Sequence, residues 1–187
     1  MERKPRTDRW RSTRKALLEL PVILLISFVL VFGLVRPVVA SPFYVGSESM
    51  VPTLKVWDRV LINKLAYDLE ESLRGDIVLF ESLDGGKDPL IKRVVGLPGE
   101  TVELRNGELF VDGERVEEPY LDRKACVSGK PKTCSFGPLE VPEGHVFVMG
   151  DNRAHSFDSR FFGPVAEGDL IGESLFRFWP PARAGIP

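Results

Sequence analysis

The stretch from residue 77 to residue 99 reads IVLFESLDGGKDPLIKRVVGLPG. Its two apolar runs, 77–80 and 90–95, flank a glycine-containing turn, and this pattern is typical of two buried strands. Lys92 and Arg93 interrupt the second run. In a strand these two cations point to opposite faces, so one of them lies against apolar neighbours unless both faces are wet. A lysine in such a place is costly unless it serves a function.

The neighbouring segments carry further strand signals. Extended patterns occur at 38–45, 56–67, 146–149 and 171–179. Three short strands are predicted over 101–118, around Asn106-Gly107 and Asp112-Gly113, because these dipeptides favour two-residue hairpin turns. Beyond the first 40 residues no stretch shows a long helical period or an internal repeat. We therefore expect a mainly β fold, an antiparallel β-sheet domain with a small β-hairpin insert at 101–142.

Composition and charge limit the classes of protein. The 187 residues are 43% hydrophobic, which permits one globular domain with a core plus one membrane segment. Residues 1–15 carry seven basic and two acidic side chains, a net charge of +5, whereas the whole chain is −2, so the remainder carries −7. An acidic remainder argues against nucleic acid as a partner of the folded part.

One apolar run is long enough for a membrane. From Leu17 to Val35 the run contains a single charged residue, Glu19. At about 1.5 Å per residue a helix there would span roughly 28 Å, close to the ~30 Å of a bilayer core. We therefore expect a single N-terminal transmembrane helix.

The charge distribution predicts the topology of that helix. By the positive-inside rule, the chain divides into a cytoplasmic basic tail at 1–15, a transmembrane anchor at 16–40 and an extracytoplasmic domain at 41–187. A cleavable secretory signal is the alternative, since small residues follow the apolar run. We favour the retained anchor because the run exceeds a usual signal core and Arg36-Pro37 follows it directly.

The only two cysteines are Cys126 and Cys134, separated by a segment of loop composition. We expect a local disulfide between them, because the compartment beyond a membrane can be oxidising. Two free surface thiols are the alternative. Two thiols with no histidine nearby make a poor metal site, and we expect neither a metal nor a cofactor.

Two polar stretches are candidates for a site. Gly46-Ser47-Glu48-Ser49 opens a segment in which, if it is extended, Ser47 and Ser49 share one face. Residues 150–160 form the densest polar cluster of the chain. Taken alone, the serine stretch could equally be a turn.

The residue types restrict the chemistry. A serine, histidine and aspartate triad would have to use His145 or His155, and neither spacing is diagnostic. A serine and lysine dyad remains open, because lysine can deprotonate serine where desolvation makes its neutral amine accessible. Lys92 on an apolar strand meets that requirement.

Five segments, taken in order, resemble those of bacterial type I signal peptidases. The matching segments are 47–54, 58–67, 75–80, 91–100 and 150–163. The resemblance implies a serine endopeptidase in which Ser49 is the nucleophile and Lys92 the general base. Ser47 and the backbone amide of Ser49 would then form the oxyanion hole.

The resemblance also implies supporting residues. Ser156 corresponds to a serine that orients the lysine, and Asp158 and Arg160 to a pair beneath the site. Gly46 and Ala154-His155 depart from the usual family pattern without removing a catalytic group. They leave the reaction in place and put only loop geometry in question.

The implied substrate is a secreted preprotein with an Ala-x-Ala-like cleavage site, held beside the site as an added strand. The candidate pocket walls are Phe43, Val45, Met50, Leu54, Leu79 and Ile91. As ordinary core residues these side chains would look the same. The implied location is the inner (plasma) membrane, single-pass, with the lipid bilayer as a second partner and no nucleic acid.

Two other classes remain as rivals. An anchored, non-catalytic β-domain could capture extended peptides, with the two serines as turn residues. A self-cleaving repressor would also use serine and lysine, but the membrane-length run and the lack of a DNA-binding segment argue against it.

Overall fold

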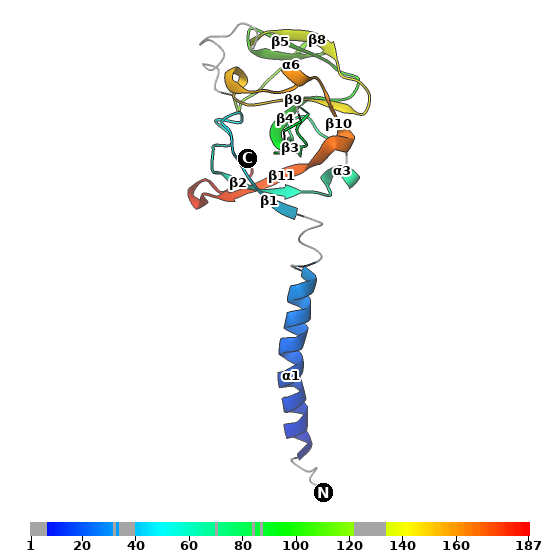
Figure 1. Cartoon of the computed structure of the whole chain (residues 1–187), viewed down its shortest axis with the longest axis vertical. Helices are drawn as coiled ribbons and strands as arrows, with labels where there is room; N and C mark the ends of the chain where they lie inside the picture. The colour runs from blue at the N-terminus through cyan, green and yellow to red at the C-terminus, as the bar shows by residue number, and fades with distance from the viewer. Residues whose placement is uncertain are drawn as a thin grey trace. The chain divides into compact units, whose positions relative to one another are not determined.

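A computed structural model of the chain describes residues 7–31, 33, 40–69, 71–83, 85–86, 88–121 and 134–187. The chain divides into two compact units, Met1–Val39 and Ala40–Pro187. The first unit contains the helix α1 (Thr7–Leu30), and the second contains the strands (Figure 1). The mainly β character expected of residues beyond 40 is confirmed.

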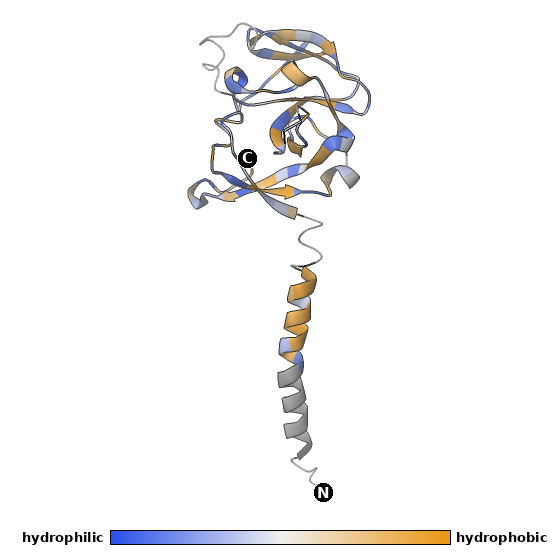
Figure 2. Ribbon diagram, in the orientation of Figure 1, coloured by the Kyte–Doolittle hydropathy of each residue, from blue (hydrophilic) through white to orange (hydrophobic). Residues whose placement is uncertain are grey.

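Helix α1 includes Pro21. From Leu20 onward its side chains are predominantly apolar and exposed (Figure 2). Within the described part of the chain, no helix combines the length and the apolar character needed to cross a membrane. The transmembrane anchor therefore stays a prediction from the sequence.

A seven-stranded antiparallel sheet forms the body of the second unit, in the order β1-β2-β11-β3-β4-β9-β10. Its strands are β1 (Ala40–Tyr44), β2 (Arg59–Asn63), β3 (Ile77–Phe80), β4 (Leu90–Gly96), β9 (His145–Met149), β10 (Val165–Ala166) and β11 (Leu170–Trp179). Strands β3 and β4 are thus the two buried strands predicted from the 77–99 stretch, and they lie in the middle of the sheet.

The hairpin insert forms a second, four-stranded sheet in the order β7-β6-β5-β8. Its strands are β5 (Thr101–Arg105), β6 (Glu108–Val111), β7 (Glu114–Val116) and β8 (Phe136–Glu140). Asn106 and Asp112, which begin the two hairpin turns, have φ of 51°, as two-residue turns of this kind require. Figure 1 shows β5 and β8 at the opposite end of the unit from β1 and β2.

Strand β3 is buried on both faces. Ile77 and Leu79 belong to one hydrophobic cluster, whereas Val78 and Phe80 belong to another. A strand that is covered on both sides has no polar face to alternate with, which explains why residues 77–80 read as a continuous apolar run. A third cluster joins Phe147 and Met149 of β9 to residues of β5 and β6.

Two local expectations needed correction. The strand expected over 56–67 is shorter, because β2 ends at Asn63 and Ala66–Leu69 form a short helix, α3. Strand β8 was not predicted; it contains Gly137-Pro138, and proline is rare within strands. Among the described residues, further short helices are the 3₁₀ turns Arg153–His155, Glu167–Asp169 and Pro181–Arg183 and the helix α6 (Ser159–Phe162).

The predicted disulfide falls at the edge of the described residues. Cys134 is disulfide-bonded. Cys126, the one other cysteine of the sequence, lies outside the described residues. The disulfide state of Cys134 excludes the alternative of two free thiols.

Candidate active site

Ser49 and Lys92 meet in the interior of the second unit. Lys92 Nζ donates to Ser49 Oγ at 2.9 Å and to the carbonyl of Ile91 at 2.9 Å. Lys92 is 2% exposed and Ser49 is 6% exposed. Lys92 lies in the middle of β4, directly opposite Val78 of β3, so apolar strands flank its stem.

Burial changes the proton affinity of this lysine. Desolvation lowers the pKa of Lys92 from 10.5 to about 8, although the negative charges of Asp158 and Asp151 partly oppose this shift. Desolvation disfavours the ammonium because the charged form loses its hydration. A neutral amine next to a serine hydroxyl is therefore accessible near neutral pH.

The serine segment is a series of turns, which is the alternative to an extended chain that the sequence left open. Val51 N donates to the carbonyl of Glu48 at 3.1 Å, and Leu54 N donates to the carbonyl of Met50 at 2.9 Å. The hydroxyls of Ser47 and Ser49 nevertheless lie 3.1 Å apart. The turn therefore brings together the two side chains that an extended chain would also have placed on one face.

The polar segment after β9 holds the serine segment in place. Asn152 donates through its backbone N to the carbonyl of Ser49 at 2.9 Å and through Nδ2 to the carbonyl of Glu48 at 3.1 Å. Gly150 packs so closely that an added Cβ would lie 2.4 Å from the carbonyl oxygen of Ser49. The residue at 150 must therefore be glycine for the serine carbonyl to keep its place.

Arg93 and Asp151 form a buried ion pair beside Lys92. Arg93 Nε and Nη2 donate to the two carboxylate oxygens of Asp151 at 3.0 and 2.9 Å. Asp151 also accepts from Thr53 Oγ1 at 2.5 Å, and the Arg93 guanidinium lies 4.0 Å from the centre of the Tyr120 ring. Both cations of the Lys92-Arg93 pair are thus buried, and each has its own partners.

Two further ion pairs involve the polar segment after β9. Arg160 donates to both carboxylate oxygens of Asp158 at 2.8 Å, and Asp158 accepts from Gly150 N at 3.0 Å. Arg153 donates to both oxygens of Glu118, one of them at 2.9 Å. Because Glu118 follows β7, this contact ties the hairpin insert to the site.

The family match covers the residues of this site. The sequence profile of a family described as signal peptidase, peptidase S26, matches residues 17–179. This chain belongs to that family. It is therefore a peptidase.

Individual signal peptidases are similar over most of the chain. Signal peptidase I of Leptolyngbya laminosa is 40% identical over 167 residues, which cover 86% of this chain and 78% of that protein. Signal peptidase I S of Bacillus subtilis (strain 168) is 40% identical over 174 residues, covering 90% and 92%. A crystal structure of a signal peptidase I from Enterococcus faecalis V583 gives a TM-score of 0.47 at 36% identity, covering 56% of this chain and 97% of that chain.

Ser156 occupies a distinctive place in this signal peptidase-family chain. It is buried, and its Oγ has no hydrogen-bond partner among the described residues. An added Cβ at Gly150 would lie 2.3 Å from Ser156 Oγ and 2.4 Å from the Ser49 carbonyl oxygen, so Ser156 lies close to the serine segment. Its role in orienting the lysine stays a prediction, since Lys92 Nζ donates to Ser49 and Ile91.

The six predicted pocket residues gather in one hydrophobic cluster. Its buried members include Val45, Met50, Leu54, Leu79 and Ile91, with Phe43 packed against them. Met50 and Ile91 are the chain neighbours of Ser49 and Lys92, so the cluster adjoins the site. The buried members have the exposure of core residues, and their use as pocket walls stays a prediction.

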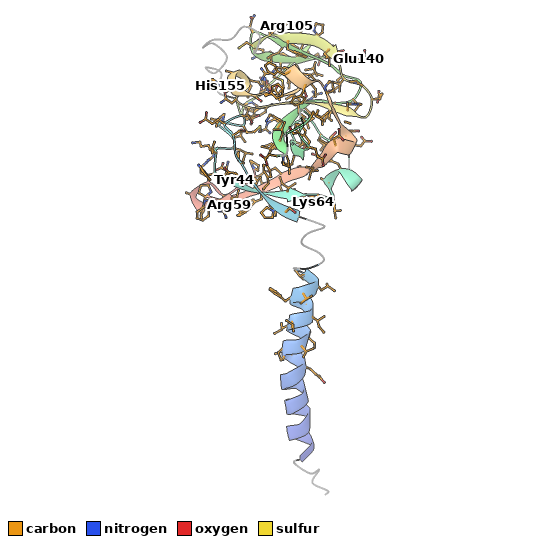
Figure 3. All side chains as sticks on the ribbon, viewed as in Figure 1. Tyr44, Arg59, Lys64, Arg105, Glu140 and His155 are labelled. Atoms are coloured by element: carbon orange, nitrogen blue, oxygen red, sulfur yellow. The ribbon has the colours of Figure 1, made fainter. Side chains whose placement is uncertain are left out.

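The histidines lie elsewhere. His145 contacts the carbonyl of Glu143, and His155 is exposed at the side of the unit (Figure 3). The described partners of the Ser49 hydroxyl are instead Lys92 and Ser47. In the described ranges, no group of three or more His, Cys, Asp or Glu side chains is placed to hold a metal ion.

Several side chains that lie around the candidate site were not predicted from the sequence. Thr53, Arg93, Glu118 and Tyr120 received no role. Adjacency was the one available signal, because Thr53 lies within the serine motif and Arg93 is next to Lys92. Nothing in the spacing indicated Glu118, which reaches Arg153 from the insert.

Proposed function

We propose that this chain is a membrane-bound serine endopeptidase that removes N-terminal signal peptides from secreted preproteins. Ser49 is the nucleophile and Lys92 is the general base. The observation that carries the proposal is the 2.9 Å contact between Ser49 Oγ and Lys92 Nζ, on a lysine that is 2% exposed. A serine hydroxyl is a weak nucleophile until a base takes its proton, and burial lowers the pKa of this base to about 8.

The reaction proceeds in two halves. The neutral Lys92 amine takes the proton of Ser49 Oγ, which attacks the carbonyl carbon of the scissile bond. Ser47 Oγ and the Ser49 amide donate to the oxyanion, and Lys92 returns the proton to the departing amine of the mature protein. Lys92 then deprotonates a water molecule that attacks the carbonyl of the acyl-enzyme, and it returns this proton to Ser49 Oγ as the ester bond breaks and the signal peptide leaves.

The supporting residues act through their contacts. Asp158 and Arg160 fix the backbone at Gly150, whose amide donates to Asp158, and so hold the polar segment against the carbonyl of Ser49. Ser156 is close enough to the serine segment to turn its free hydroxyl toward the lysine during the cycle. Each of these groups restricts the positions that Ser49 and Lys92 can adopt, which keeps the reacting atoms in the productive geometry.

Substrate choice belongs to the apolar cluster next to the dyad. Phe43, Val45, Met50, Leu54, Leu79 and Ile91 form the walls that admit small side chains. An extended preprotein lies along them as an added strand. Such walls select alanine at the first and third positions before the cut, an Ala-x-Ala-like site.

In the proposed topology the catalytic domain lies at a membrane surface. The anchor is the segment 16–40, with the tail 1–15 in the cytoplasm and residues 41–187 outside the inner (plasma) membrane. The support is the +5 tail beside the apolar run in the sequence and the exposed apolar side chains of α1 from Leu20. A bilayer accepts such a surface and favours basic residues on the cytoplasmic side.

Cleavage of a purified preprotein by the full chain in detergent tests this function. We expect wild type to cut after a small residue, as read by sequencing the new amino terminus. Ser49→Ala should lower the rate by more than about 1,000-fold, because the nucleophile is gone. Ser135→Ala is the matched control, since Ser135 is exposed in the insert, and its rate should equal that of wild type.

Two results would overturn the proposal. Full cleavage by folded Ser49→Ala would remove Ser49 as the nucleophile. A preprotein that binds well-folded wild type and stays intact would instead identify a non-catalytic peptide-binding domain.

A further inference from the structure

The C-terminal end of the chain turns back after β11 (red in Figure 1). Arg177 near the end of β11 exchanges two backbone hydrogen bonds with Gly185, at 2.8 and 3.0 Å. Between these residues the chain forms the 3₁₀ turn Pro181–Arg183. Arg177 Nε also donates to the carbonyl of Arg183, so the returning segment is fixed to the strand that it leaves.

The two arginines of this segment converge on the serine segment. Arg177 Nη1 donates to the carbonyl of Thr53 at 2.6 Å, and Arg183 Nη2 donates to the same oxygen at 3.3 Å. Arg183 Nη1 donates to Asp58 Oδ1 at 2.9 Å, and Asp58 is 2% exposed. Asp58 in turn accepts from Lys55 N at 2.9 Å. The arginines therefore hold the chain on both sides of Lys55.

This cluster contains two cations and one anion, whereas pairing of charges alone would give each arginine its own carboxylate. Two guanidinium groups share one carboxylate and one neutral carbonyl. Burial, and then the neighbouring charge of Arg183, lowers the pKa of Arg177. Like charges held together are unfavourable, and the carboxylate of Asp58, which both arginines face, offsets part of this repulsion.

Thr53 links this contact to the nucleophile. Its carbonyl is held by the arginines and its hydroxyl by Asp151, at 2.5 Å. Thr53 lies in the turn that is closed by the hydrogen bond from Leu54 N to the carbonyl of Met50. Ser49 directly precedes this turn, and its carbonyl accepts from Asn152 N. The turn that carries Ser49 is thus fixed at its start by the polar segment and at its end by the C-terminal arginines.

We infer that Arg177 and Arg183 are positioning residues for the reaction, because they fix the carbonyl of Thr53 and through it the place of Ser49 Oγ relative to Lys92. This inference rests on the proposed function. It concerns the turnover step and not substrate binding, since both arginines contact the serine segment, Asp58 and the C-terminal segment itself. A misplacement of the reacting group by about 1 Å costs on the order of 100-fold in rate.

The test compares preprotein cleavage by full-length Arg183→Gln and Arg105→Gln in detergent. Arg105 is the matched control, because it also forms an ion pair, with Glu103. It lies at the opposite end of the unit from Arg59 and Tyr44 (Figure 3). Arg59 marks the end that carries the C-terminal arginines, because it pairs with Trp179 at the end of β11. Active sites are counted by a serine-directed acylating inhibitor. Per active site, we expect Arg183→Gln to lower kcat by about 10- to 100-fold with KM within about twofold of wild type. Arg105→Gln should match wild type in both.

Further outcomes keep the inference falsifiable. Arg183→Lys should recover part of kcat, because an ammonium reaches Asp58 or the Thr53 carbonyl but cannot form the fork that reaches both. A normal kcat per titrated site with fewer titratable sites would mean that Arg183 only stabilises the fold, and the inference would fall. If Arg183→Gln yields no titratable sites, the same criterion applies to Arg183→Lys.

The wild type and Ser49→Ala, assayed together, separate the two ideas. Cleavage by wild type that is lost in Ser49→Ala, together with a normal kcat for Arg183→Gln, would overturn the arginine inference alone. No cleavage by wild type would overturn the proposed function, and the inference with it.

Discussion

Lys92 is a charged side chain held almost out of contact with water in the middle of β4. Its pKa is lowered from 10.5 to about 8, so the unfolded chain binds more protons between these pH values. The stability cost of the lysine is therefore full below pH 8 and fades as the pH rises toward 10.5. At ~1.4 kcal/mol per pKa unit, we expect Lys92→Met to raise the free energy of unfolding by up to about 3 kcal/mol at pH 7.

Urea unfolding of the wild type and Lys92→Met between pH 6 and 10 measures this difference. Lys64→Met is the control, because Lys64 is exposed (Figure 3) and keeps its hydration in both states. The free energies of unfolding of Lys92→Met and Lys64→Met should differ most below pH 8 and approach each other as the pH rises above 8. A Lys92→Met effect that does not change with pH would contradict the assignment of the cost to the buried charge.

At the scale of elements, a buried ion pair connects the hairpin insert to the polar segment after β9. Arg153 and Glu118 are 4% and 5% exposed in their side chains. Removing one partner of such a pair leaves the other charge buried and unpaired, which costs about 3 to 5 kcal/mol. We expect Glu118→Gln to lower the free energy of unfolding toward that range, as measured by urea denaturation.

An exposed pair in the same insert provides the control for Glu118→Gln. Arg115 and Glu108 also form an ion pair, but their side chains are 45% and 52% exposed. Glu108→Gln should therefore change stability by less than about 1 kcal/mol. Equal losses for the two variants would argue against a special role for the buried contact.

The elements that the sequence predicted are those with local signals, and the contacts that it did not predict join distant residues. Strands β3 and β4 and both hairpin turns were predictable, because apolar runs and turn dipeptides are local signals. The contact of Arg183 with Thr53 joins residues 130 positions apart, and that of Glu118 with Arg153 joins residues 35 apart. Such contacts depend on how the sheets pack, so they cannot be predicted from the spacing of residues in a single sequence.

For the whole molecule, the question is whether the hairpin insert folds with the main sheet. Phe147 of β9 is fully buried in the cluster that includes Val102 and Leu104 of β5, and its ring centre lies 5.2 Å from that of Phe136 in β8. One side chain thus contributes to the packing of both sheets. We expect Phe147→Ala to lower the free energy of unfolding by about 3 to 5 kcal/mol.

Hydrogen exchange shows whether that loss is shared by the two sheets. If they form one cooperative unit, the protection of amides in β5 and in β9 should fall by the same factor in Phe147→Ala. Phe161→Ala, at a ring that is 51% exposed, should stay within about 0.5 kcal/mol of wild type. Loss of protection in β5 alone would mean that the insert unfolds separately. Glu118 would then hold Arg153 only while the insert is folded, and the site would lose that support before the main sheet opens.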